Sequence, residues 1–201
     1  MQKILPIVAI VVTVLSIIIK GIRTSKQNAL AGKLAELLMN KKYKEFDELI
    51  NSDETNKTLP AFNITFLKLN EAIIQNNDKK VASVLADEKI AKFANSDKNL
   101  VYQKAFFYYI NKKDKDNTTK YYELLKEMNS KDLMSIDRMY DTYIKDGYEY
   151  LDITLSQLDK AETDEEKIQL YLLISNMYAN KKDDENVNKY LKMAEELVNK
   201  K

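Results

Sequence analysis

The sequence predicts an all-α protein: a stack of about five helix pairs preceded by one membrane-spanning helix. Three features indicate this fold. The 201 residues include only 3 glycines and 2 prolines, too few for the many turns of a β-rich fold. Short segments rich in Asn, Lys and Asp recur near residues 40, 76, 111, 145 and 180. A long uncharged apolar run lies near the N-terminus. We therefore expect an anchor with its basic flank at residues 1–26 and a helical-repeat domain at 27–201.

The composition excludes several kinds of chemistry. Cysteine and histidine are both absent, so the chain lacks a thiolate nucleophile, the commonest general base and the usual zinc ligands. We expect no catalytic residues, no metal site, no cofactor and no small-molecule substrate. Beyond residue 27 there are 28 basic and 31 acidic residues, a net charge of −3, which is unsuited to binding nucleic acid.

Residues 4–19 form an apolar run of sixteen residues without a charge. As a helix this run rises about 24 Å, somewhat less than a bilayer core of about 30 Å. Lys3 and Lys20 flank it and can extend their amines to the lipid headgroups. The sequence therefore favours a single uncleaved membrane anchor. Its main apolar positions are Ile4, Leu5, Val8, Val11, Val12, Leu15, Ile18 and Ile19.

Two other interpretations of this segment are weaker. A cleaved signal peptide needs a small-x-small site close to the apolar run, and the first such site, Ala29-Leu30-Ala31, comes about a dozen residues late. A buried core helix is disfavoured because nothing later in the chain is apolar enough to surround it. Lys20, Arg23 and Lys26 follow the run, whereas only Lys3 precedes it. This bias favours a cytoplasmic repeat domain over an extracytoplasmic one.

An internal repeat supports the helix pairs. Eight of thirteen positions are identical between residues 109–121, YINKKDKDNTTKY, and residues 178–190, YANKKDDENVNKY. The offset is 69 residues, close to two periods of a 34-residue unit, and the five punctuated turns are spaced by 34 to 36 residues. Thr163 and Glu166 form a capping-box pattern that opens the last pair.

The apolar positions around each turn resemble the tetratricopeptide repeat, in which large and small residues alternate where two helices cross. The last pair carries this pattern at Tyr171, Ile174, Ser175, Tyr178, Val187, Leu191 and Ala194. The third carries it at Tyr102, Ala105, Phe106, Tyr109, Thr118, Tyr122 and Leu125, and the fourth at Ile136, Met139, Tyr140, Tyr143, Leu151, Leu155 and Leu158. The resemblance covers roughly residues 28–199 and implies an α-solenoid.

The same resemblance implies a concave groove lined by the first helix of each pair. The groove positions are Gln103, Phe107, Ile110, Asp137, Asp141, Ile144, Gln169, Leu172 and Asn176. Asp137 and Asp141 lie one helical turn apart. Their simplest interpretation is a solvated acidic face, and contact with a partner is the alternative. A mixed apolar and acidic groove suits a helix or extended peptide that carries a basic residue.

We therefore expect a membrane-tethered scaffold that holds a partner protein through this groove and is not an enzyme. Two alternatives remain open. One is an extracytoplasmic accessory protein of envelope assembly or secretion. The other is a non-catalytic subunit of a membrane enzyme or transporter complex.

Overall fold

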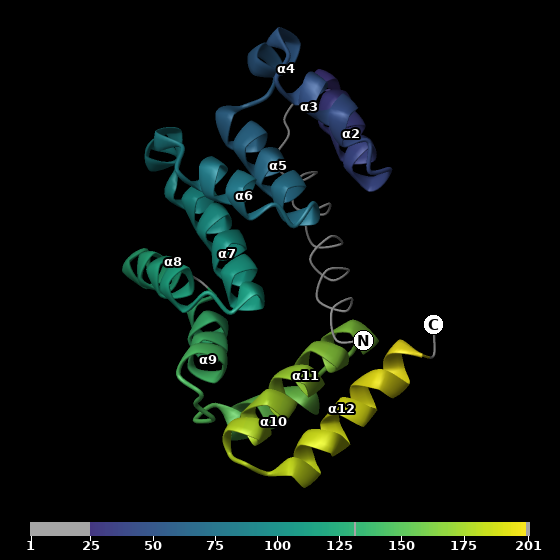
Figure 1. Cartoon of the computed structure of the whole chain (residues 1–201), viewed down its shortest axis with the longest axis vertical. Coiled ribbons are helices and arrows are strands. Elements are labelled where there is room, and N and C mark those ends of the chain that lie inside the picture. Colours follow the sequence, from purple (N-terminus) through teal and green to yellow (C-terminus); the bar gives the residue numbers. More distant parts are fainter. Residues whose placement is uncertain (1–24, 131, 200–201) are drawn as a thin grey trace. The chain divides into compact units, whose positions relative to one another are not determined.

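The structure, a computed structural model, describes residues 25–130 and 132–199, and these residues are helical throughout apart from turns and short loops (Figure 1). The described residues contain no strand, so the predicted all-α class is confirmed. The helices are α2 (Ser25–Met39), α3 (Tyr43–Ile50), α4 (Asp53–Thr58), α5 (Ala61–Ile74), α6 (Asp78–Leu85), the 3-10 helix η1 (Glu88–Lys92), α7 (Asn95–Lys112), α8 (Lys115–Glu127), α9 (Leu133–Ile144), α10 (Leu151–Leu158), α11 (Asp164–Asn180) and α12 (Asp184–Val198).

Each of the five predicted turns joins two helices: α2 to α3, α5 to α6, α7 to α8, α9 to α10, and α11 to α12. Every one of them contains a non-glycine residue in the left-handed region, with φ between 53° and 63°. These residues are Lys41, Asn76, Lys113, Asp146 and Lys182. Glycine usually occupies such positions. Because these five residues are not glycine, the usual sequence signal for the end of a helix is missing at these turns. Two short helices that the sequence did not predict, α4 and η1, follow the first two pairs.

Four of these turns end the first helix with the same pair of backbone hydrogen bonds. At the first turn, Lys41 N donates to Leu38 O at 3.1 Å and Lys42 N donates to Leu37 O at 2.8 Å, which is a Schellman motif. The same two bonds recur after α5, α7 and α11. The turn after α9 differs, because Gly147 N donates to Asp141 O at 2.9 Å.

The two sequence segments offset by 69 residues have the same local structure. Tyr109 stacks on Tyr121 with ring centroids 5.8 Å apart, and Tyr178 stacks on Tyr190 at 5.6 Å. Asp114 and Asp183 each cap the second helix of their pair by accepting a hydrogen bond from the backbone N–H three residues later. The identical residues therefore close each helix pair at its turn, and the repeat inferred from sequence is a repeat of structure.

The chain divides within α7 into two compact units, the first ending at Val101 and the second beginning at Tyr102. The first unit has its core around Leu34, Phe46, Ile50 and Leu67, each at most 1% exposed. A core of the second unit gathers α10, α11 and α12. In it α11 and α12 lie side by side in opposite directions (Figure 1). Many of the packing positions predicted from the repeat are buried, including Thr118 on α8 and Ala194 on α12, which are 0% and 2% exposed, whereas others such as Val187 and Leu191 are half-buried.

No helix between residues 25 and 130 or between 132 and 199 is long and apolar enough to cross a bilayer. The predicted anchor at residues 4–19 lies outside the described residues.

Candidate functional site

The predicted groove positions of the fourth and fifth pairs lie on α9 and α11, which contact each other. The contact includes a hydrogen bond of 3.4 Å from Asn176 Nδ2 to Tyr143 Oη. Asn180 Nδ2 donates to two carbonyls near the end of α9, Thr142 O at 2.8 Å and Gly147 O at 2.9 Å. The capping box of Thr163 and Glu166, confirmed by the structure, starts α11. We call the half-buried residues Asp137, Ile144, Leu172 and Asn176 the α9–α11 surface.

The other predicted groove residues have different surroundings. Gln103 on α7 is half-buried, and its Nε2 donates to Ser130 Oγ at 3.3 Å and to Asp132 Oδ2 at 3.0 Å, so it ties α7 to the segment before α9. Phe107 is half-buried beside Phe106. Ile110 is only 6% exposed and is left out of the α9–α11 surface because a partner could not reach it. Gln169 is exposed on α11.

Asp141 is buried, and the expected solvated acidic face is therefore wrong at this position. Asp141 is 8% exposed, and its side-chain oxygen Oδ2 is buried without a hydrogen-bond partner. The carboxylate lies against the backbone at Gly147, where an added Cβ would overlap both of its oxygens. The loop after α9 folds back over the helix, and helical periodicity alone does not predict that contact.

Two tyrosines, Tyr122 and Tyr150, lie near these carboxylates. Burial, together with a hydrogen bond to Asp137, raises the pKa of Tyr122 to about 12. Burial also raises the pKa of Tyr150, and the charges of Asp137 and Asp141 act in the same direction. Arg138, next to Asp137 in sequence, hydrogen-bonds instead to Thr154 and Gln157 of α10. Neither aspartate has an ion-pair partner among the described residues.

Gly147→Ala is expected to lower the free energy of unfolding by about 1–3 kcal/mol, because the new methyl group would displace the Asp141 carboxylate. Urea unfolding followed by circular dichroism measures this change. In a double-mutant cycle, Asp141→Ala removes the overlapping oxygens, and Gly147→Ala should then cost little. If Gly147→Ala lowered the free energy of unfolding equally in the wild-type protein and in the Asp141→Ala variant, the two residues would not be in contact.

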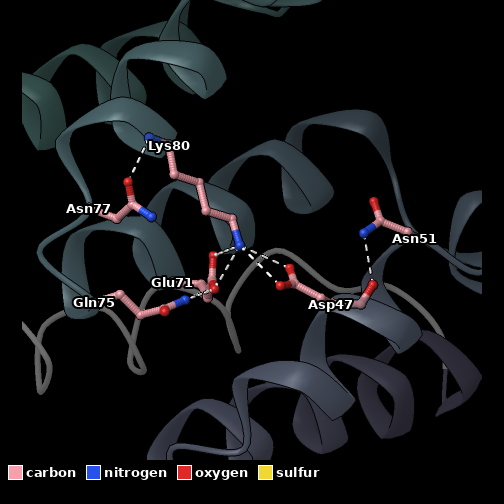
Figure 2. Close-up of polar contacts among 6 residues, drawn as sticks. All are labelled: Asp47, Asn51, Glu71, Gln75, Asn77 and Lys80. Atoms are coloured by element: carbon pink, nitrogen blue, oxygen red, sulfur yellow. Dashed lines mark hydrogen bonds and ion pairs between the residues drawn. The ribbon is translucent and has the colours of Figure 1, made fainter.

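The first unit contains a charged network that the sequence analysis did not identify (Figure 2). Lys80 on α6 extends its Nζ to Glu71 on α5, 2.7 Å from Oε2, and to Asp47 on α3, 2.9 Å from Oδ1. Gln75 also donates to the Glu71 carboxylate. The Glu71 side chain is completely buried, that of Lys80 is 28% exposed, and that of Asp47 is 45% exposed. Three helices are thus joined through one ammonium group.

Opposing effects act on the titration of this network. Burial raises the pKa of Glu71, and the nearby charge of Lys80 only partly offsets it. Burial lowers the pKa of Lys80, but its bonds to Glu71 and Asp47 outweigh that effect, so its pKa is raised overall. The sequence did contain a signal: Glu71 stands among Leu67, Leu69, Ala72, Ile73 and Ile74, where a carboxylate must find a cation.

In the described part of the chain, no three acidic, histidine or cysteine residues are grouped so that they could hold a metal ion. Comparisons with protein-family models, with curated proteins and with solved structures find no match.

Proposed function

We propose that this chain is a membrane-tethered scaffold that holds a partner protein through the α9–α11 surface. It catalyses no reaction and needs no cofactor. The tether is residues 1–26, and the scaffold is a solenoid of tetratricopeptide-like helix pairs. Five turns at similar spacing support this architecture, four of them with the same cap, as do the tyrosine stacks that recur in two of the pairs.

One observation carries the proposal: α9 and α11, the first helices of consecutive pairs, contact each other directly. First helices that lie side by side build a continuous surface across pairs, as in repeat proteins that bind peptides. On this surface Ile144 and Leu172 are half-buried apolar residues, and Asp137 is a carboxylate without an ion-pair partner among the described residues. Apolar anchors with a nearby charge are the usual elements of a protein interface.

Site-specific photo-crosslinking of the full chain in its own cells tests the proposal. A crosslinking amino acid at Gln169, exposed on α11 beside this surface, should give a discrete adduct with one partner. The matched control is Glu195, exposed on α12. Leu172→Ala should weaken partner capture by about 1–2 kcal/mol without changing helicity. Adducts at Glu195 alone would move the interface to another face and refute the α9–α11 surface.

The tether is tested separately, because it depends on the sequence of residues 4–19. The full chain should remain with membranes after salt and carbonate washing, whereas residues 27–201 should be soluble. Protease protection of the repeat region then distinguishes a cytoplasmic scaffold, the favoured orientation, from an extracytoplasmic accessory protein. A catalytic polypeptide in the Gln169 adduct would favour an accessory subunit of an enzyme complex.

A further inference from the structure

The internal repeat allows α12 to be compared with α8 position by position. At the offset of 69 residues, three packing positions of α8 correspond to three of α12: Thr118 to Val187, Tyr122 to Leu191, and Leu125 to Ala194. The three α8 residues are buried. The helix α9 packs against α8, and Tyr122 stacks on Tyr140 of α9 with ring centroids 3.9 Å apart. The element that covers this face of α8 is thus the first helix of the following pair.

The corresponding face of α12 carries apolar side chains that are only half-buried. These are Val187, Leu191 and Val198, which follow helical spacing along one side of the helix, and we call them the α12 face. They lie outside the core that α10, α11 and α12 share, against which Met193 and Leu197 of the same helix pack. By comparison with α8, the element that fits the α12 face is an amphipathic helix.

The charges beside this face are inverted between the two repeats. Lys115 and Lys126 of α8 correspond to Asp184 and Glu195 of α12, and all four side chains are exposed. Asp184 is three residues from Val187 and Glu195 is four from Leu191, so both carboxylates border the α12 face. Neither has an ion-pair partner among the described residues. A helix that covers α12 should therefore carry basic residues beside its apolar stripe.

We propose that the α12 face binds an amphipathic helix of a partner protein, with lysine or arginine residues along the border of its apolar stripe. This is a second interaction surface, separate from the α9–α11 surface. A second copy is disfavoured as the occupant, because two α12 faces in an antiparallel pair would bring Asp184 of one copy toward Glu195 of the other. The same carboxylates disfavour contact with anionic lipids.

The helix that covers α8 supplies the probe. Two labelled peptides of residues 132–145, which contain α9, are titrated with the full chain in phosphatidylcholine nanodiscs, and fluorescence anisotropy measures binding. One peptide has the native sequence, and the other carries Asp137→Lys and Asp141→Lys. The basic peptide should bind about tenfold more tightly than the native one at low salt. Equal affinities would overturn the proposal, as would binding no stronger than to empty nanodiscs.

A charge reversal in the full chain locates the binding. Asp184→Lys combined with Glu195→Lys gives α12 the charges of α8 and should reverse the preference, so that the native peptide binds more tightly. The matched control is Glu185→Lys combined with Glu196→Lys, which makes the same change in net charge on exposed residues of α12 away from this face. The control should keep the preference for the basic peptide. The same preference in both double variants would refute the α12 face.

Two further measurements decide the occupant. If sedimentation showed a dimer of the full chain that Leu191→Ala dissociates, a second copy would occupy the face and the proposal would be wrong. In cells, a helix bound there should give an adduct at Glu195 in addition to the one at Gln169, and Asp184→Lys should diminish it. An adduct at Gln169 alone would leave the scaffold surface and remove the α12 face. An adduct at Glu195 alone would do the reverse.

Discussion

Lys80→Met is expected to lower the free energy of unfolding of the first unit by about 3–5 kcal/mol, because it leaves the buried Glu71 carboxylate without its cation. Methionine keeps most of the apolar stem of lysine, so the change removes mainly the charge and its hydrogen bonds. Urea unfolding measures the loss. Hydrogen exchange should quicken in α3, α5 and α6, the three helices joined by Lys80 (Figure 2).

Two matched variants separate charge from packing. Asp47→Asn should cost only about 0–1 kcal/mol, because the Asp47 side chain is 45% exposed. Glu71→Leu combined with Lys80→Met should recover much of the stability, since an apolar pair needs no desolvation of charge. If Lys80→Met were as mild as Asp47→Asn, the ammonium group would not compensate Glu71.

The stability loss in Lys80→Met should depend on pH. Because burial raises the pKa of Glu71, the folded state takes up a proton before the unfolded state does as the pH falls toward the ordinary value of 4.5. Acidification through this range therefore favours the folded state at this residue. Removing Lys80, which opposes that rise in pKa, strengthens the effect. The variant should recover part of its lost stability between pH 7 and pH 5, and a loss that is independent of pH would contradict this account.

Phe106→Ala is expected to destabilise the second unit by about 3–5 kcal/mol. The Phe106 side chain is 0% exposed in α7, so its removal leaves a cavity. Its neighbour Phe107 is the matched control, since it is half-buried and Phe107→Ala should cost distinctly less. Thermal unfolding followed by circular dichroism compares the two variants. Similar losses would show that the two rings are equally packed and that the helix face assigned to the core is wrong.

The sequence by itself determined the five helix pairs and the spacing of their turns, but not the short helices α4 and η1. The turns at Lys41, Asn76, Lys113 and Lys182 were located from Asn, Lys and Asp composition, although none contains glycine. Their signal is local: a helix ends, a left-handed residue follows, and in three of the pairs a polar side chain caps the next helix. The capping box at Thr163 was located for the same reason. Core positions such as Ala194 followed from the resemblance to the tetratricopeptide repeat, whose spacing is read along the sequence.

Only the tertiary structure decided which polar residues are buried and what they meet. Asp141 lies one helical turn after Asp137, as expected for carboxylates on a solvated helix face, but the loop containing Gly147 covers it. The resemblance to the tetratricopeptide repeat placed Ile110 in a groove, yet it is buried. Glu71, Lys80 and Asp47 lie on three different helices, and their charges meet only when those helices pack. The local sequence pattern determines which face of a helix is apolar. Whether a charged side chain is buried depends on segments distant in sequence, because these segments cover the side chain and supply its counterion.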